Sequence, residues 1–471
     1  MKSANRRWCV AVAAAYFISA CTALPPRAPA HPERSAEDFA ARRLPGKLSD
    51  LPPAADGWDV DAWFRVALAL NPQLAEARSA ALAVAAGERT AAERPNPNLN
   101  LFGEYVNAAA GSAAWLYGVS LEFLLPRRGE RARAMASASL ETQASQADVA
   151  EAIWQLRSQV HQALLDVAYA HDETALLAGL VADRESLLAS NHALADAGEI
   201  AKSETLTQEL ELARVRQRLM RAQALGADAE ARLAAAVGVS VAALDGIPLQ
   251  WQHWADIKAL TPRPSSEWRS AALIGRPTLV HALREYDLTD IALQSEVAKR
   301  WPQFHVTPGY AWDKSGLNEN TANDTLHDNE LAVSFELPIF NRHEGPIGEA
   351  LARREHAGRH LEAVQAQLFE QIERAERAWP QALQAWQHAA AAGSLATRQH
   401  AAEESAFAAG ATDRPTLLAA TLAATEAELV TLEAAYDARI AFAALESAYR
   451  RPLEGAQELP LPATLVGAAR S

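Results

Sequence analysis

The chain has 471 residues, of which 49% are hydrophobic and 22% are charged, and its formal net charge is −14. This length allows two or three ordinary domains or one elongated assembly. The acidic balance argues against a nucleic-acid partner, because nucleic acids are bound through basic surfaces. The two cysteines, Cys9 and Cys21, both lie near the N-terminus. Their position excludes a disulfide framework and a cysteine-based metal site in the rest of the chain.

The first residues have the pattern of a bacterial export signal. Basic residues precede an apolar run that is too short to span a bilayer, and the run ends in Ile18-Ser19-Ala20-Cys21. This ending resembles a lipobox, although a plain cleaved signal has similar features. We predict a lipoprotein signal peptide over residues 1–20 and a lipid on Cys21. Residues 21–57, rich in Pro, Ala and charge, are expected to form an extended, lipid-anchored tether.

Two halves of the chain repeat the same order of features. A tryptophan-containing helical pattern is interrupted by Asn71-Pro72 in one half and by Arg276-Pro277 in the other, and Gly198 corresponds to Gly410. The offset between matching features stays near 205–214 residues, which indicates an internal duplication. The predicted units are a first repeat over 58–237, a joining segment over 238–264, a second repeat over 265–451 and a tail over 452–471.

Long helices are predicted in both repeats. Each repeat should open with a helix that breaks and restarts at its proline, over about 60–93 and 266–299. Very long helices follow over about 131–197 and 347–409, where glycine and proline are scarce, and each is about 100 Å long at 1.5 Å per residue. Returning helices are expected over about 201–237 and 415–449. Their many alanines favour close coiled-coil packing.

Four segments have the period-two alternation of β-strands. They are 95–107, 115–125, 303–312 and 331–340, and in the second of them every odd position from Trp115 to Leu125 is large and apolar. A length of about ten residues with aromatic side chains near the ends fits a transmembrane strand, and a half-buried soluble sheet gives the same alternation. Four strands are too few to close a barrel. If they cross a membrane, several chains must contribute to one barrel.

The sequence around the second strand-to-helix turn resembles a known family. Residues 337–350 read Leu-Pro-Ile-Phe-Asn-Arg-His-Glu-Gly-Pro-Ile-Gly-Glu-Ala, and Asn71-Pro72-Gln73-Leu74 begins the first repeat. These segments are similar to those of TolC-type outer-membrane efflux factors, most of all the heavy-metal (CzcC- or CusC-like) branch. The resemblance implies a mostly α-helical, internally duplicated TolC-like fold. A homotrimer would combine a 12-stranded outer-membrane β-barrel with a helical coiled-coil tunnel in the periplasm.

The turns between the long helices are the expected location of a gate and of an adaptor-binding tip. By resemblance to family members, Glu204 follows the first turn glycine and Phe407 precedes the second. Thr412 occupies the position, two after the second glycine, where TolC itself has an arginine, and Asp413 and Arg414 lie next to it. These residues are candidates for gating ion pairs, and ordinary solvated turn charges would have the same pattern. Rings of carboxylates at a constriction favour cations.

No catalytic, cofactor or metal motif is evident, and we expect a protein that is not an enzyme and needs no cofactor. The 13 histidines are scattered. His356 and His360 have the i,i+4 spacing of a shared metal site, although a solvated helix face is the more common explanation.

The resemblance implies a passive conduit that exports heavy-metal cations from the periplasm to the exterior. Its partners would be a periplasmic adaptor (membrane fusion protein), an inner-membrane RND pump and outer-membrane lipid. Two alternatives stay open. The same conduit could export drugs or other small organic molecules, or the chain could be a lipid-anchored coiled-coil scaffold without channel activity.

Overall fold

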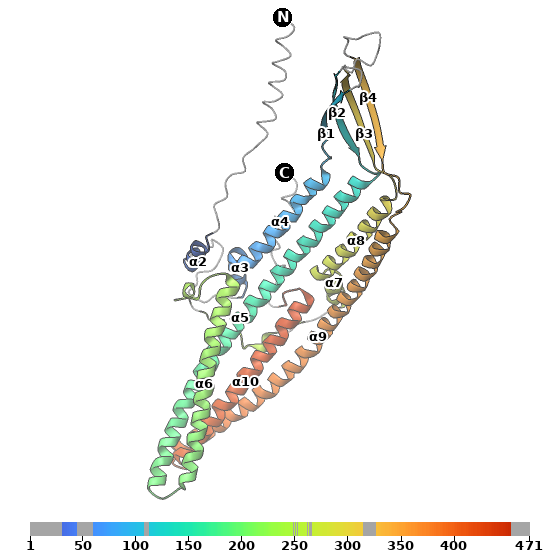
Figure 1. Cartoon of the computed structure of the whole chain (residues 1–471). Coiled ribbons are helices and arrows are strands. Elements are labelled where there is room, and N and C mark those ends of the chain that lie inside the picture. The colour runs from blue at the N-terminus through green and yellow to red at the C-terminus, as the bar shows by residue number, and fades with distance from the viewer. Residues whose placement is uncertain are drawn as a thin grey trace.

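The computed structural model describes residues 31–44, 60–107, 113–247, 249, 251, 253–260, 262, 266–313 and 326–453. The predicted signal peptide and Cys21 lie outside the described residues, as does nearly all of the predicted tail. The described part is an elongated body in which a small sheet stands at one end of a set of long helices (Figure 1).

The two repeats have the same order of elements. The first contains α3 (Val60–Leu70), α4 (Pro72–Ala92), β1 (Asn98–Asn107), β2 (Ala113–Leu125), α5 (Glu130–Asp196) and α6 (Lys202–Val237). The second contains α7 (Ser266–Ile274), α8 (Pro277–Ala298), β3 (Phe304–Asp313), β4 (Leu326–Phe335), α9 (Glu344–Ala408) and α10 (Arg414–Tyr449). Short 3-10 turns η2 (Val241–Ala243) and η3 (Ile257–Ala259) lie in the joining segment, and α2 (Pro32–Ala40) precedes the first repeat. The helices form within a few residues of their predicted positions.

The longest helices organise the body along its length. Next to the sheet, α4 packs on α5, and α8 packs between α5 and α9. Farther away, α6 and α10 replace α4 and α8 in contact with α5 and α9. The hairpins α5–α6 and α9–α10 therefore reach the end of the molecule opposite the sheet (Figure 1).

Each opening helix breaks where the sequence predicts, and the break faces the end of a returning helix. Asn71 is the N-cap of α4, since its side-chain oxygen accepts a hydrogen bond from the Leu74 backbone N–H at 2.8 Å. Its amide group donates to the Ala236 carbonyl, also at 2.8 Å. The α3–α4 break is thereby attached to the last turn of α6.

The starts of α5 and α9 share an unusual backbone conformation. Their N-cap residues, Gly129 and His343, have φ values of 74° and 59°, in the left-handed region. A left-handed residue turns the chain sharply from sheet to helix at low cost only when it is glycine. In the second repeat a histidine, His343, adopts this conformation, which is less favourable for it than for glycine.

The hydrophobic core consists of clusters along the helices. One joins α3, α4, α5 and α6; a second joins α5, α9, α10 and the joining segment; a third lies near the far end between α5, α6 and α10. Alanine is frequent in the first two. Small side chains let the helices approach closely, in agreement with the predicted coiled-coil packing.

Two expectations from the sequence need correction. Residues 32–40, inside the predicted extended tether, form the helix α2, whose residues are all exposed and which starts at Pro32. The fourth strand, predicted over 331–340, occupies Leu326–Phe335. Pairing with β3 determines these limits, because Leu326 lies opposite Asp313 and Phe335 lies opposite Phe304, the terminal residues of β3.

No helix among the described residues has both the length and the apolar character that crossing a membrane requires.

Candidate functional site: a one-faced sheet and paired helical tips

The four strands form an antiparallel meander with the order β1-β2-β3-β4. The register aligns the apolar positions of all the strands on one face, where Leu101 is 76% exposed and Leu331 is 70% exposed. Among the described elements, no helix packs across the sheet. The apolar face consists of Leu99, Leu101 and Tyr105 of β1, Trp115, Tyr117, Val119, Leu121, Phe123 and Leu125 of β2, Phe304, Val306, Tyr310 and Trp312 of β3, and Leu331, Val333 and Phe335 of β4.

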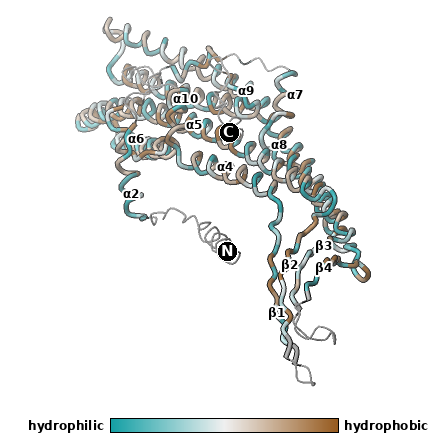
Figure 2. Tube along the Cα trace, turned by 90° about the horizontal axis from the view of Figure 1, so that it is seen from above, coloured by the Kyte–Doolittle hydropathy of each residue, from teal (hydrophilic) through white to brown (hydrophobic). Residues whose placement is uncertain are grey.

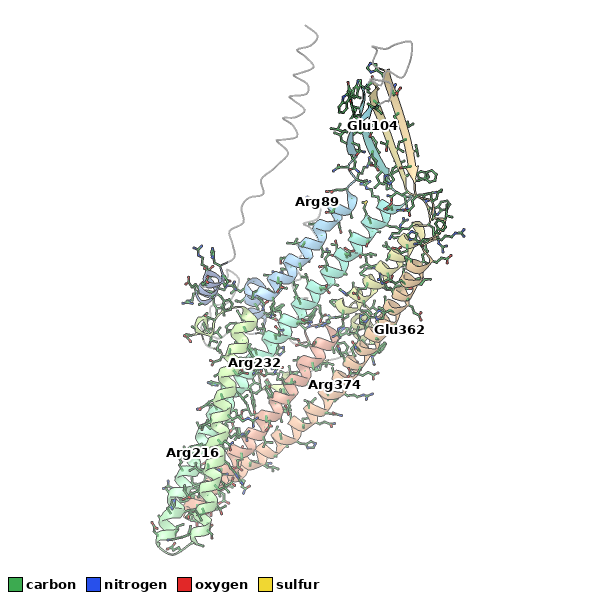
Figure 3. The ribbon with its side chains drawn as sticks, viewed as in Figure 1. Arg89, Glu104, Arg216, Arg232, Glu362 and Arg374 are labelled. Carbon is green, nitrogen blue, oxygen red and sulfur yellow. The ribbon has the colours of Figure 1, made fainter. Side chains whose placement is uncertain are left out.

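The opposite face of the sheet is mostly polar or small, with Phe102, Leu116 and Leu124 among its large apolar residues. Here His305 of β3 and Glu122 of β2 approach within 2.6 Å, and Glu104 of β1 lies on the same face of the sheet (Figure 3). Phe102 covers Gly118, where an added Cβ would come within 2.5 Å of the phenyl ring and 2.8 Å of the Tyr310 carbonyl oxygen. The sheet is therefore amphipathic, and its strands form a separate group at one end of the helices (Figure 2).

Aromatic side chains gather at both ends of the apolar face. Near the loops, Tyr105 and Trp115 have ring centroids 4.9 Å apart, and Tyr310 and Trp312 are 4.8 Å apart. At the helix end, Phe304 and Phe335 are 5.2 Å apart. Amphipathic aromatics at the two borders of an apolar band are typical of the interfaces between membrane and water.

The outer edges of β1 and β4 have no strand partner among the described residues. An open edge presents unpaired backbone N–H and C=O groups, which are tolerated in water but cannot face hydrocarbon. In a single chain, the apolar face therefore favours contact with hydrocarbon, whereas the open edges require water. A neighbouring strand on each side would pair the edges and allow the apolar face to contact lipid.

The two helical turns with the predicted gate residues lie at the end of the molecule opposite the sheet (Figure 1). Gly198 and Gly410 adopt left-handed φ values of 78° and 71° in these turns. The α5–α6 and α9–α10 hairpins are joined nearby by an ion pair between Arg184 and Glu426 at 2.6 Å. The structure thus brings the two predicted tips to the same end of the molecule.

The predicted gate residues lie on the surface of these tips. Glu204, Asp413 and Arg414 are exposed, and Phe407 is 41% exposed. None of the three charged residues forms an ion pair among the described residues. Asp413 is also the N-cap of α10, because its carboxylate accepts a hydrogen bond from the Thr416 N–H at 3.0 Å. That hydrogen bonding lowers the pKa of Asp413.

The histidine pair considered as a metal site is not supplemented by further ligands. His356 and His360 are both exposed on α9. The described residues contain no group of three or more His, Cys, Asp or Glu side chains that could hold a metal ion. His327 of β4 lies 2.8 Å from the Tyr310 hydroxyl.

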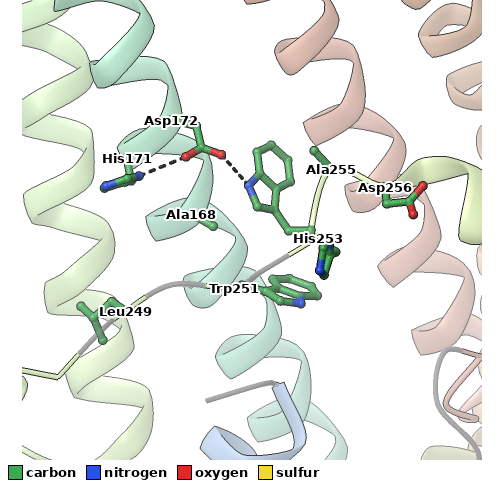
Figure 4. Close-up of a pocket in the computed structure, with 9 residues that line it drawn as sticks. Ala168, His171, Asp172, Leu249, Trp251, His253, Ala255 and Asp256 are labelled. Atoms are coloured by element: carbon green, nitrogen blue, oxygen red, sulfur yellow. Dashed lines mark hydrogen bonds and ion pairs between the residues drawn. The ribbon is translucent and has the colours of Figure 1, made fainter. Parts of the chain in front are cut away.

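The joining segment crosses the middle of the helices and forms an open pocket of about 470 Å³ with α5 (Figure 4). Asp172 of α5 is central, since one carboxylate oxygen accepts from the Trp254 indole N–H at 2.8 Å and the other lies 3.0 Å from His171. These contacts hold the segment to the helix. Both oxygens of the Asp172 carboxylate therefore already have partners, which favours a structural role for this residue.

A buried polar cluster behind this segment was not predicted. Arg157 and His161 of α5 each lie 3.6 Å from a carboxylate oxygen of Glu446 in α10. Arg439, only 2% exposed, donates to the backbone carbonyls of Trp254 and His253 at 2.5 and 3.2 Å. Burial, followed by the charges of Arg157 and Arg439, lowers the pKa of His161 to about 3. Charged residues in a helix do not show by themselves which of them will be buried, so the sequence offered no signal.

Comparisons with known proteins agree with this architecture. Residues 268–449 match the family described as outer membrane efflux protein. None of the curated proteins that were compared matches the chain.

Several solved structures share the fold. The outer-membrane channel OprN is similar with a TM-score of 0.67 and 15% identity, over 88% of this chain and 99% of that chain. CusC gives 0.65 and 17%, over 91% and 99%. The open state of the Neisseria gonorrhoeae MtrE outer-membrane channel gives 0.65 and 18%, over 84% and 89%. The chain therefore has the TolC-like fold of outer-membrane channels, with the matched family segment in its second repeat.

Proposed function

We propose that the chain is the subunit of an outer-membrane export channel, a passive trimeric conduit in a tripartite efflux system. The observation that carries this proposal is the amphipathic sheet with two open edges at one end of helices about 100 Å long. The fold shared with OprN, CusC and MtrE supports it, as does the efflux-family match of residues 268–449.

The number of three subunits comes from the resemblance to the efflux family, and strand pairing explains how such a ring would close. In a ring of three chains, β4 of each chain would pair with β1 of the next and give a closed barrel of twelve strands. Closure would place the apolar face toward lipid and the polar face, with Glu122 and His305, toward the lumen. The helices of the three chains would continue the barrel as a tunnel on the periplasmic side, and the tips carrying Glu204 and Asp413 would meet a periplasmic adaptor and an RND pump.

Conductance tests the conduit directly. The full-length protein, extracted in detergent, should migrate as a trimer. When it is added to a planar bilayer of neutral phosphatidylcholine, it should open ion-conducting channels. A form lacking residues 1–20 that is water-soluble, monomeric and non-conducting would instead support the alternative of a coiled-coil scaffold.

For the cargo, we propose heavy-metal cations, because the segment at residues 337–350 resembles the heavy-metal branch and exposed carboxylates lie at the tips. Deleting the gene should lower tolerance to zinc, cobalt, cadmium, copper or silver. Unchanged metal tolerance together with hypersensitivity to drugs would establish the alternative cargo, small organic molecules, and leave the conduit itself intact.

The lipid on Cys21 is a separate part of the proposal. Cys21→Ser should abolish metabolic labelling with palmitate, while membrane association should persist because a closed barrel needs no further anchor. Normal labelling of the variant would contradict lipidation at this residue.

A further inference from the structure

The base of the sheet, where strands meet helices, has a local charge opposite to that of the chain. The chain is acidic overall, at −14. At the strand-to-helix crossings, however, arginines outnumber the carboxylates Glu93, Glu130, Glu336 and Glu344. We call this group the arginine collar: Arg94, Arg127, Arg128, Arg131, Arg133, Arg300 and Arg342.

The collar arginines differ from those of the helical body in their partners. Along the helices, arginines pair with carboxylates, for example Arg216 with Glu185 at 2.6 Å and Arg232 with Asp166 at 2.7 Å. None of the collar arginines has a carboxylate within ion-pair distance among the described residues. The positive charge at this level of the molecule is therefore not neutralised within the chain.

Several collar arginines hold the chain crossings together through backbone carbonyls. Arg127 Nε donates to the Trp301 carbonyl at 2.9 Å, and Arg131 Nε donates to the Ala92 carbonyl at 2.9 Å. Each guanidinium has five N–H donors. One such bond positions the group and leaves most of its donors available to an external acceptor.

Arg94, Arg128 and Arg342 are exposed and their guanidinium groups make no hydrogen bond within the described residues. They are the members of the collar that are most available to a ligand. Planar guanidinium groups of this kind match the oxygens of a phosphate in geometry and charge.

Exposed apolar side chains accompany the collar. Trp301 is 74% exposed, and Leu337, Ile339 and Phe340 are exposed in the segment between β4 and α9. They lie in the segments that adjoin the helix-side ends of β3 and β4. Adjacent apolar and cationic groups at the border of an apolar band suit the boundary between lipid tails and headgroups.

We propose that the arginine collar binds the phosphate headgroups of anionic phospholipids in the leaflet on the helix side of the sheet. The proposal rests on the membrane location given by the proposed function. It adds a lipid preference, and it predicts that the collar positions the sheet at a defined depth in that leaflet. Arg or Lys near an anionic surface strengthens binding about fivefold per residue.

The test uses the full-length protein in neutral detergent and titrates phosphatidylglycerol or phosphatidylcholine with the same acyl chains, with bound lipid counted by native mass spectrometry. Because each of the three available arginines contributes about fivefold, the parent should retain phosphatidylglycerol at about a hundredfold lower concentration than phosphatidylcholine. The variant Arg94→Gln/Arg128→Gln/Arg342→Gln should lose that preference. The same triple change to Lys should keep most of it, because the positive charge remains.

A matched control removes the same charge from exposed positions far from the collar: Arg65→Gln/Arg221→Gln/Arg374→Gln. The control should retain the parent's lipid preference. An equal loss in the control and the collar variant, or a parent with no preference, would overturn the proposal. Displacement of phosphatidylglycerol by equimolar inorganic phosphate would overturn it as well, because the site would then bind free anions.

Conductance of the parent in phosphatidylcholine alone separates this proposal from the proposed function. If the parent conducts but has no lipid preference, the proposed channel function is supported and lipid binding by the arginine collar is refuted. If the parent does not conduct, the proposed channel function is refuted, whatever lipid the protein binds.

Discussion

In both repeats, the break in the opening helix contacts the C-terminal end of the returning helix, and we call this contact the joint. The two repeats form the joint with different side chains. In the first repeat, the α3–α4 break carries Asn71 and faces the C-cap of α6, Gly238, with φ 89°. In the second, the α7–α8 break carries Arg276 and faces the C-cap of α10, Arg450, with φ 50°. Both C-caps are left-handed, yet only one is the residue that adopts this conformation freely.

Space explains the difference. A Cβ on Gly238 would lie 2.6 Å from the Leu70 carbonyl oxygen and 2.8 Å from Cδ of Pro72. In the second repeat the long Arg276 side chain separates break and helix end, donating to Gln371 at 2.7 Å and to the Ala448 carbonyl at 3.4 Å. Arg450 there pairs with Glu151 and lies 5.7 Å over the Trp154 ring. One joint is closed by direct backbone contact and the other by buried side chains.

The largest expected effect is on the close joint. Gly238→Ala should lower the free energy of unfolding by about 3 kcal/mol, because it adds left-handed strain to a steric clash. Chemical unfolding followed by circular dichroism measures this loss. Gly179→Ala, on α5 with nothing within 4 Å of the added Cβ, is the control and should stabilise slightly. If Gly238→Ala left the free energy of unfolding unchanged, the joint of the first repeat would have space for a methyl group. The proposed difference between the two joints would then be wrong.

The second joint should be sensitive to its charged side chain. Burial lowers the pKa of Arg276 to about 10, so it remains cationic at neutral pH. Arg276→Met should cost about 1–2 kcal/mol, since it removes the hydrogen bonds to the Gln371 side chain and to the carbonyl of the buried residue Ala448. Adding Gln371→Met removes one of those acceptors and should recover part of the loss in a double-mutant cycle. Fully additive losses would indicate that Arg276 does not act through Gln371.

The repeats also differ in the polar cluster of the core. Aligning the starts of α5 and α9 places Ala375 opposite His161, and aligning the ends of α6 and α10 places Ala234 opposite Glu446. Both alanines are buried. At the two matching positions, one in each repeat, buried alanines therefore stand where His161 and Glu446 have titratable side chains.

Acid should reveal this asymmetry. The pKa of His161 is lowered from 6.5 to about 3 in the fold. The unfolded chain thus binds a proton that the folded chain excludes, so the stabilisation is complete above pH 6.5 and is lost as pH falls toward 3. At pH 5 the loss is about 2 kcal/mol. His161→Phe should flatten this part of the pH profile of unfolding, whereas His356→Gln, at an exposed position, should leave it unchanged. If His161→Phe and the parent had the same pH dependence of unfolding, protonation of His161 would not be the cause of the loss of stability in acid.

The smallest effects on stability, with the clearest effects on conductance, are expected at the tips. Arg414→Glu replaces a positive charge with a negative one at the α9–α10 tip of each chain, and like-charge repulsion in the proposed trimer should raise single-channel conductance at neutral pH. Glu204→Gln should weaken cation preference, as measured by reversal potentials in a salt gradient. Parent-like behaviour of both variants would identify these residues as ordinary solvated turn charges.

The sequence predicted the fold well where the physical signal is local. Proline breaks, scarce glycine in the long helices and alternation in β2 are properties of neighbouring residues, and the corresponding elements formed close to their predicted positions. β4 was displaced because its limits depend on β3, a distant partner. The apolar alternation through Leu337 and Ile339 continues past the last paired residue and therefore suggested a longer strand.

The candidate site was predicted less completely. The tips were located from their glycines, but the capping role of Asp413 appears only when the start of α10 is known to the residue. The contacts of His161, Arg439 and Glu446 join segments far apart in the chain. Such contacts depend on tertiary packing, and no local pattern encodes them.

The unpaired edges of β1 and β4 also have a consequence for how the sheet is maintained. If the missing hydrogen bonds come from other copies of the chain, part of the free energy that holds the sheet together is obtained only on association. Mass action then couples folding to concentration, so the temperature at which the sheet melts should rise with the amount of protein, while the helical hairpins should melt at a temperature independent of it.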